Sequence, residues 1–363
     1  MSAPAADRPA DSTADPTTDG YPETLDHEDV VVHRGRRSGL FTFVAVHSTV
    51  RGPAVGGCRM WGYVDARHAL RDALRLSRAM TYKSAVADLP LGGGKGVIMT
   101  APAAVLPPEH RTAALLDFGD TVESLGGRYI TAEDVGTSSR DMRVIAQRTT
   151  HVVGLPRRQG GSGDPSPYTA LGVEAAIRAC CERVFSSSSL QGRTVAVIGL
   201  GHVGLRVAKR CAKGGAQLVV SDIDNRKRHL ADELGAGWVA PAQALESDVD
   251  VLAPCALGGV LNRETVPRLR CQIVAGAANN QLANESVADL LAARRILWAP
   301  DFVANAGGLI NIAEELNGYH PAAAARRVRR IGETITQIFD EADTTGATPL
   351  TAALEIARKR LAA

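Results

Sequence analysis

The amino-acid sequence predicts an α/β protein of two domains, the second built on a Rossmann-type, doubly wound parallel sheet. The chain has 363 residues, which is long for a single hydrophobic core. Apolar runs of strand length alternate with stretches of helical periodicity along most of it. One apolar run leads through a glycine-rich turn into a helix, at "TVAVIGLGHVGLRVAKR". Such alternation is typical of parallel sheets with helices on both faces.

The composition is that of an ordinary globular protein, with 45% hydrophobic and 22% charged residues. A formal net charge of +2 does not favour nucleic acid or an anionic membrane as a partner. No long uncharged apolar segment occurs, and the N-terminus lacks the order of a signal peptide. The six cysteines include no C-x-x-C pair and no metal-ligand spacing with histidine. We therefore expect a reduced, cytoplasmic protein that binds no metal, nucleic acid or membrane.

The first domain is expected at residues 26–150, after a disordered tail at 1–25 that is rich in Pro, Ser, Thr and Asp. The helix predicted at 66–89 carries apolar residues three and four apart, and Pro108 opens the next helix. In chain order we expect two strands around a glycine-containing turn at 30–50, then the helix at 66–89, a strand at 95–100, a helix at 108–125 and a strand at 128–136.

A segment rich in glycine and proline, residues 155–169, marks the crossing into a second domain at 151–320. Pro165 and Pro167 are expected to stiffen this crossing. The elements that follow are a helix at 170–184, a strand, turn, helix and strand over 194–222, a helix at 225–235, strands at 249–256 and 271–278, a helix at 285–295 and a strand at 296–300. Residues 321–363 are expected to be helical.

Gly199, Gly201 and Gly204 form the spacing G-x-G-x-x-G between an apolar strand and a helix. The first glycine would make the tight turn, the second would admit a pyrophosphate and the third would pack the helix on the strand. Asp222, at the end of the next strand, would bind the adenosine ribose and repel a 2′-phosphate. The pattern predicts NAD as cofactor rather than NADP, a preference softened by Arg226 and Arg228 nearby. The alternative is a glycine-rich turn in a non-binding α/β domain.

Asn279 and Asn280 follow a strand at the edge where the cofactor crevice is expected. Their amides would reach the nicotinamide ribose, and the alternative for one of them is helix capping. Cys255 ends another strand, but no base is near it in sequence, so we interpret it as a small packing residue and not a nucleophile.

The stretch "PLGGGKG" allows two interpretations of Lys95. Either Gly92, Gly93 and Gly94 make a loose turn with a solvated lysine, or they let the backbone approach closely around an amine held in a cleft. Lys83 has a similar choice between a solvated helix residue and a ligand contact, and Asp134 between a turn cap and an active group. We expect all these polar groups at the ends of strands and helices.

Nine short motifs occur in one order along the chain: "GPAVGGCRM" (52–60), "MTYK" (80–83), "GGGKG" (92–96), "TAEDVGT" (131–137), "GGSGD" (160–164), "GLGHVG" (199–204), "PCALGG" (254–259), "GAANNQLA" (276–283) and "DFVANAGG" (301–308). Together they resemble the amino-acid dehydrogenases that deaminate glutamate, leucine, phenylalanine and valine, most closely the leucine, valine and phenylalanine enzymes. The resemblance implies a first domain for substrate binding and oligomerisation, C-terminal helices that pack back on it, and a homo-oligomer.

The resemblance also implies roles for single residues. Lys83, with the backbone of Gly56 and Gly57, would bind the α-carboxylate of the substrate. Lys95 would be the general base, and Asp134 would exchange protons with the amino group. Thr169 would contact the nicotinamide carboxamide, and Asn305 would help to hold the substrate amine.

The chemistry of deamination supports a buried Lys95 independently of any family. Hydride transfer from Cα leaves an imine that water must attack, which requires a base that works near neutral to mildly alkaline pH. A free lysine is mostly protonated there, whereas burial and a second cation, Lys83, favour the neutral amine. A 2-hydroxy-acid dehydrogenase, which usually pairs a histidine with a carboxylate, is therefore a weaker hypothesis, and so is a catalytically silent NAD-binding subunit.

The substrate is expected to be an apolar L-amino acid, since no clear cation is present for a glutamate side chain. The resemblance implies that Val55, directly before the two glycines, shapes the pocket as an apolar residue does in the leucine and valine enzymes, which favours leucine, valine or isoleucine. The alternatives are phenylalanine, since Gly332 is smaller than the tyrosine that the resemblance implies for a leucine enzyme and would enlarge the pocket, or an unusual amino acid. Glu133 places a second carboxylate beside Asp134, which would either raise the pKa of Asp134 or bind another group.

Overall fold

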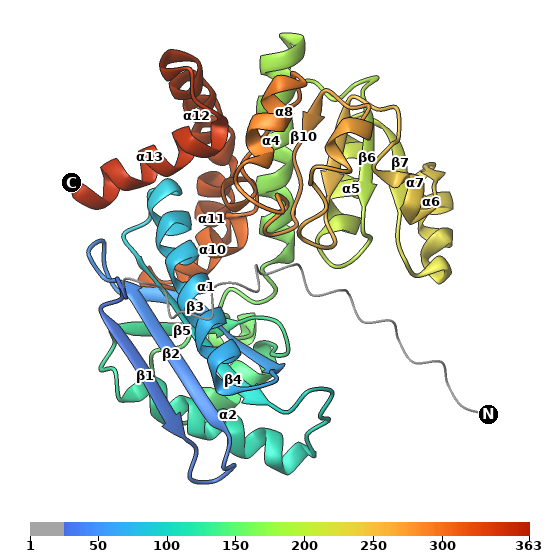
Figure 1. Ribbon diagram of the computed structural model, residues 1–363. Helices are drawn as coiled ribbons and strands as arrows, with labels where there is room; N and C mark the ends of the chain where they lie inside the picture. Colours follow the sequence, from blue (N-terminus) through green and yellow to red (C-terminus); the bar gives the residue numbers. More distant parts are fainter. Residues whose placement is uncertain (1–24) are drawn as a thin grey trace.

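The computed structural model describes residues 25–363, which form two α/β units, each built around one sheet (Figure 1). The predicted fold class is confirmed. Apart from Leu25, the tail expected to be disordered lies outside the described residues.

The first sheet has five strands in the order β1-β2-β4-β3-β5, in which β1 and β2 are antiparallel to their neighbours and β3, β4 and β5 are parallel. Strand β3, which contains the two glycines of "GPAVGGCRM", is not among the predicted elements, because glycine has a low strand propensity. The strands are β1 (Asp29–Arg34), β2 (Phe41–Ser48), β3 (Ala54–Gly62), β4 (Gly92–Thr100) and β5 (Tyr129–Glu133).

Helix α1 (Ala66–Val86) covers one face of this sheet, and α2 (Pro108–Glu123) with α3 (Ser139–Ile145) covers the other. The alternation of β2 shows this division. Phe43 packs in the cluster that includes the apolar side of α1, whereas Val44 packs in the cluster that includes α2. The apolar side of α1, which the sequence pattern predicts, therefore packs on one face of the sheet.

The second sheet has six parallel strands in the order β11-β10-β9-β6-β7-β8. The chain reverses direction across the sheet between β6 and β9, the position at which doubly wound sheets bind ligands. The strands are β6 (Thr194–Ile198), β7 (Gln217–Ser221), β8 (Gly237–Trp238), β9 (Val251–Pro254), β10 (Ile273–Val274) and β11 (Leu297–Trp298). The helices around them are α5 (Gly204–Lys213), α6 (Arg228–Leu234), α7 (Pro241–Ala244) and α8 (Val287–Ala293).

A long helix, α4 (Ser166–Phe185), lies between the second sheet and the C-terminal helices (Figure 1). It begins four residues before the predicted position, because proline is favoured in the first turn of a helix and supplies its start here. The remaining helices are α9 (Asp301–Ala304), α10 (Gly307–Ala313), α11 (Pro321–Arg329), α12 (Ile331–Thr345) and α13 (Pro349–Ala362).

The C-terminal residues are helical as expected, and within them α11 and α12 meet at Arg330. Both pack on α4, and α12 also contacts α13. Helix α13 returns to the first domain, where the Arg360 guanidinium donates to the carbonyl of Val86, 2.6 Å away, at the end of α1. This contact joins the C-terminus of the chain to the helix that carries Lys83.

Candidate active site

The register of the first sheet brings several predicted site residues onto one face. Val55 on β3 lies opposite Gly93 on β4, and Gly57 lies opposite Ala132 on β5. Paired residues in neighbouring strands share a face, and Lys95 follows Gly93 by two residues on the same strand. These side chains therefore face the side of the sheet that α1 covers. Gly56, Gly57 and Lys95 lie within strands, not at the strand ends where we expected them.

The glycines before Lys95 begin strand β4 and do not form a turn. A Cβ atom on Gly93 would lie 2.0 Å from the backbone nitrogen of Thr81 in α1, and one on Gly94 would lie 2.6 Å from the Tyr129 ring. At both positions glycine allows a neighbouring group to lie close to the strand. Any larger residue there would push that group away. Lys95 itself is 5% exposed, so the interpretation of a buried amine is confirmed.

The Lys95 ammonium forms an ion pair with Asp134, with 2.7 Å between Nζ and Oδ2. Asp134 lies directly beyond β5, and the same oxygen accepts a hydrogen bond from Arg59 Nε at 3.0 Å. Burial alone would raise the pKa of Asp134, but Lys95 and Arg59 hold it below its usual value. The expectation that Glu133 raises this pKa is wrong. Instead, burial and Asp164 raise the pKa of Glu133 itself to about 6.

Lys83 occupies the last turn of α1 and contacts the second domain. Its Nζ donates to Asn305 Oδ1 at 2.5 Å, and Asn305 Nδ2 donates to Asn279 Oδ1 at 2.7 Å and to the carbonyl of Ala277. Burial, with the charge of Lys95 nearby, lowers the pKa of Lys83 to about 8, against the opposing effect of Asp301. The predicted substrate-binding lysine and asparagine thus bind each other across the two domains.

Apolar side chains on the sheet face that carries Lys95 pack with side chains of the second domain. Val55 and Ala132, on the same sheet face as Lys95, are buried in one hydrophobic cluster with Leu309 and Ile312 of α10. The expectation that Gly332 enlarges this pocket is wrong: a Cβ there would face Ala175 on α4, 3.3 Å from its carbonyl oxygen. Gly332 therefore sets the packing of α12 on α4.

The glycine-rich turn after β6 has the geometry that a pyrophosphate requires. Gly199 has a φ of +97°, which favours glycine, and a Cβ on Gly204 would lie 1.8 Å from the carbonyl oxygen of Gly199. A Cβ on Gly201 would meet no atom within 4 Å, so this position faces open space at the start of α5. The turn fits the pyrophosphate of NAD, which the backbone at Gly201 and the N-terminus of α5 would hold.

Asp222 directly follows the last residue of β7, at the predicted end of the strand, and is 8% exposed. Its carboxylate accepts hydrogen bonds from the backbone of Leu200 and Asp224, and it forms an ion pair with Lys227, 2.8 Å from Nζ to Oδ2. The cation beside Asp222 is therefore Lys227. Arg226, which we expected to soften the preference for NAD, pairs with Asp224 instead.

The other residues predicted to contact the cofactor, Thr169, Asn279 and Asn280, have different partners in the structure. Thr169 lies in the first turn of α4, where its hydroxyl donates to the Pro165 carbonyl at 3.2 Å. Asn279 is held by Asn305, whereas Asn280 adopts a φ of +51° and accepts the Gly259 N–H through its backbone carbonyl. Burial raises the pKa of Cys255 to about 12, so this thiol stays protonated, in agreement with its interpretation as a packing residue.

Two residues of this region have no role in the sequence-based prediction, Arg59 and Lys227. Arg59 follows Gly57 by two residues, so a strand over "GPAVGGCRM" would have placed it on the same face as Lys95. Lys227 follows Asp222 by five residues, and no periodicity marks it, because it lies in a short 3₁₀ helix at Asn225–Lys227.

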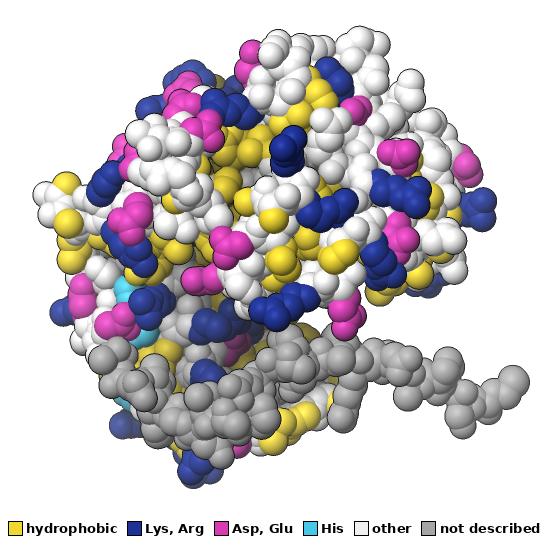
Figure 2. Space-filling model, turned by 45° about the horizontal axis from the view of Figure 1, so that its top comes forward, with side chains coloured by type: hydrophobic (Ala, Val, Ile, Leu, Met, Phe, Trp, Pro, Cys, Tyr) yellow, Lys and Arg dark blue, Asp and Glu magenta, His cyan; other side chains and the backbone are white. Residues whose placement is uncertain are grey.

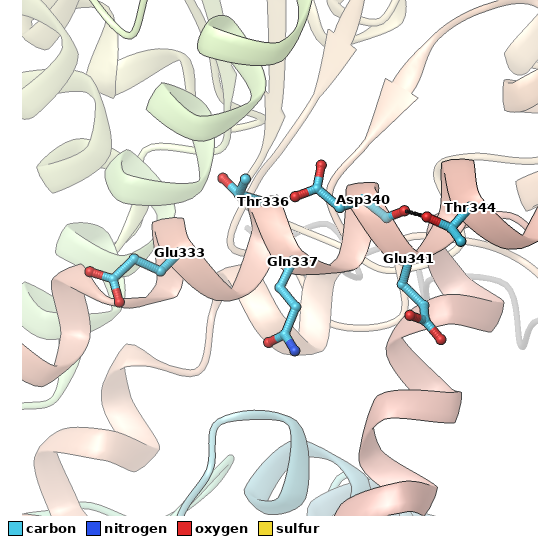
Figure 3. Close-up of a pocket in the computed structure, with 6 residues that line it drawn as sticks. All are labelled: Glu333, Thr336, Gln337, Asp340, Glu341 and Thr344. Atoms are coloured by element: carbon cyan, nitrogen blue, oxygen red, sulfur yellow. Dashed lines mark hydrogen bonds between the residues drawn. The ribbon is translucent and has the colours of Figure 1, made fainter.

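The face shown in Figure 2 carries interspersed Lys, Arg, Asp and Glu side chains and no extended patch of one sign. A groove on α12 (Figure 3) is lined by Glu333, Thr336, Gln337, Asp340, Glu341 and Thr344, all from one helix and none of them a predicted site residue. Within residues 25–363, no helix is long and apolar enough to cross a membrane.

Known proteins resemble the chain over both domains. Residues 27–151 match the dimerisation domain of Glu/Leu/Phe/Val dehydrogenases, and residues 220–363 match the Glutamate/Leucine/Phenylalanine/Valine dehydrogenase domain. Residues 174–258 also match the NAD binding domain of D-isomer specific 2-hydroxyacid dehydrogenases. This last match is confined to the nucleotide-binding part, so it does not favour the hydroxy-acid hypothesis.

Individual relatives agree with these matches. Leucine dehydrogenase of Thermoactinomyces intermedius is 43% identical over 94% of this chain and 92% of its own length. Phenylalanine dehydrogenase of Caldalkalibacillus thermarum is 39% identical over 94% and 93%, respectively. The crystal structure of L-tryptophan dehydrogenase from Nostoc punctiforme superposes with a TM-score of 0.80 at 41% identity, covering 93% of this chain and 96% of that one. The chain therefore belongs to the glutamate, leucine, phenylalanine and valine dehydrogenase family, and it is an NAD-dependent amino-acid dehydrogenase.

Proposed function

We propose that the protein catalyses the reversible oxidative deamination of an apolar L-amino acid to the 2-oxo acid and ammonia, with leucine, valine and isoleucine as favoured substrates. The observation that carries the proposal is the convergence of Lys83, Lys95 and Asp134 beside the buried aliphatic side chains of Val55 and Ala132. Aliphatic side chains favour the binding of an apolar substrate side chain. They offer no hydrogen-bond or ionic partner to a carboxylate side chain.

The residues act on the substrate in a defined order. Lys83, in its protonated form, binds the α-carboxylate together with the backbone of Gly56 and Gly57. Bound NAD⁺ supplies the hydride acceptor for Cα. Lys95 then takes a proton from the water that attacks the imine carbon, and Asp134 passes a proton to the departing nitrogen. Overall, amino acid, NAD⁺ and water become 2-oxo acid, ammonium and NADH, with release of one proton.

Asn305 has two roles in this proposal. Its Oδ1 holds Lys83 in the absence of substrate, and it accepts a hydrogen bond from the substrate amine once Lys83 turns to the carboxylate. On the cofactor side, Gly199, Gly201 and Gly204 hold the pyrophosphate and Asp222 the ribose, while Thr169, Asn279 and Asn280 adjoin the nicotinamide end. We also propose a homo-oligomer, because residues 27–151 match a domain described as a dimerisation domain.

Aromatic amino acids are the second candidate substrates, because relatives at about 40% identity include phenylalanine and tryptophan dehydrogenases. NADH formation, measured at mildly alkaline pH with valine, leucine, isoleucine, phenylalanine, tryptophan and glutamate in turn, decides between them. We expect kcat/KM to be at least tenfold higher for a branched-chain substrate. A preference for an aromatic substrate keeps the reaction and overturns the substrate assignment. No activity with any of them, in a protein that binds NADH, would overturn the reaction.

Lys95→Met tests whether Lys95 is the base of the chemical step. It removes the amine while keeping much of the buried volume, so we expect NADH binding to persist and turnover to be lost. Turnover retained by this variant would contradict the assignment of Lys95 as the base.

A further inference from the structure

Arg59 lies on β3 with its guanidinium between two carboxylates. Its Nε donates to Asp134 Oδ2 at 3.0 Å, and its Nη1 donates to Asp72 Oδ2 on α1 at 2.8 Å. The side chains of Arg59, Asp134 and Asp72 are 22%, 24% and 15% exposed, respectively. Water therefore screens these pairs less than it screens pairs on the open surface.

Asp72 is itself held in place, which fixes the far end of the guanidinium. Its Oδ2 accepts a hydrogen bond from the Tyr63 hydroxyl at 2.6 Å, and its Oδ1 accepts one from Arg75 at 3.0 Å. Burial opposes ionisation, but these contacts and Arg59 keep the pKa of Asp72 below its usual value. Arg59 thus has one preferred orientation, directed at Asp134.

The two cations on Asp134 bind the same oxygen. Lys95 and Arg59 both contact Oδ2, and no side chain among the described residues donates to Oδ1. The backbone N–H of Asp134 donates to the Thr137 hydroxyl at 2.9 Å, which fixes the main chain. One carboxylate oxygen is therefore held, and the other remains available to a ligand.

We propose that Arg59 is a positioning residue that holds Asp134 Oδ2, so that Oδ1 exchanges protons with the substrate nitrogen throughout the reaction. The inference rests on the proposed deamination. Lys95, as the base, must be neutral for part of the cycle, and during that time its hold on Asp134 weakens. Arginine keeps its charge at every accessible pH, so Arg59 provides the constant cation.

The other titratable groups near Asp134 cannot replace this charge. They are Lys95 from β4, Lys83 from α1, Cys58 from β3 and Tyr129 from β5. Burial raises the pKa values of Cys58 and Tyr129 well above their usual ranges, so both remain neutral. Glu133, the neighbour of Asp134 in sequence, only adds negative charge as it ionises.

The test compares Arg59→Gln, Arg59→Lys and the control Arg71→Gln, which removes an exposed arginine of the same helix, α1. For Arg59→Gln we expect the acid limb of kcat/KM to move up by about one pH unit. We also expect kcat to fall about tenfold, with less than a threefold change in the amino-acid KM, because Arg59 does not bind substrate. Arg59→Lys should restore the acid limb, and Arg71→Gln should match the wild type. An acid limb and kcat unchanged in Arg59→Gln would overturn the proposal.

A second measurement requires no turnover and no variant at Arg59. The ¹³Cγ resonance of Asp134, assigned by its loss in Asp134→Asn, is titrated in the wild-type protein together with the Arg59 Nε–H resonance. We expect both to shift with the same pKa, and independent titrations would overturn the proposal. If the wild type deaminates no amino acid, the proposed function fails, while this titration still decides whether Arg59 holds Asp134.

Discussion

Replacing Gly93 by alanine tests whether the glycines before Lys95 exist to let helix α1 lie directly on strand β4. The added Cβ would lie 2.0 Å from the Thr81 backbone nitrogen, 2.3 Å from the Thr81 hydroxyl oxygen and 2.6 Å from the Ser77 carbonyl oxygen. Two of these three atoms belong to the helix backbone and have no rotamer to change. Since ordinary contacts begin near 3.4 Å, α1 must retreat by about 1.4 Å or β4 must bend.

The displacement affects both stability and activity. Overpacking a rigid core usually costs about 1–3 kcal/mol, and backbone overlap places this variant near ~3 kcal/mol. Lys83 lies six residues after Ser77 on the same helix, so the retreat also moves its ammonium away from Asn305 and the substrate carboxylate. A misplacement of about 1 Å in a binding group lowers catalysis roughly hundredfold. We therefore expect kcat/KM to fall by about that factor.

Urea unfolding and steady-state NADH formation measure the two effects. Gly237→Ala is the matched control, since its added Cβ has no neighbour closer than the Leu218 carbonyl oxygen at 3.8 Å. We expect the control to resemble the wild type in both assays. If Gly93→Ala also retained its free energy of unfolding within about 1 kcal/mol and its kcat/KM within threefold, the close packing of α1 would not be what these glycines provide.

Three further predictions concern pH, cofactor and pocket. Lys83 has a pKa of about 8 and must be charged to bind a carboxylate. The KM of the 2-oxo acid should therefore be constant below pH 7 and rise about tenfold per pH unit well above pH 8. A KM that stays constant through this pH range would contradict the role of Lys83. Lys227→Met should remove the ion pair with Asp222 and weaken NADPH binding about tenfold, while NADH affinity in a fluorescence titration stays within twofold of the wild type. Arg226→Met is the control, because Arg226 pairs with Asp224. Equal losses of affinity for both cofactors would contradict a role of Lys227 in cofactor preference. Val55→Ala should raise kcat/KM for phenylalanine relative to leucine by about tenfold, because methyl groups are removed from the pocket wall, whereas an unchanged ratio would remove Val55 from that wall.

Much of the dinucleotide site and of the helical pattern could be predicted because the information is local. The turn at Gly199, Gly201 and Gly204 depends on the backbone freedom of three glycines between one strand and one helix. Helix α1 depends on a periodicity that a single stretch carries in full. Lys83, Lys95 and Asp134 could be proposed as site residues because each lies in a short contiguous motif, whereas the contacts around them could not be predicted.

Contacts between distant segments were decided only by tertiary structure. Strand β3 was missed because its glycines lack strand propensity, and its pairing with β4 and β5 is what makes it a strand. Arg59 meets Asp134 across 75 residues, and Lys83 meets Asn305 across 222. No local pattern encodes such distances, because propensity acts over a few residues whereas sheet register and helix packing act across the whole chain. The sequence by itself determined which groups could do the chemistry, and the tertiary structure decided which of them touch.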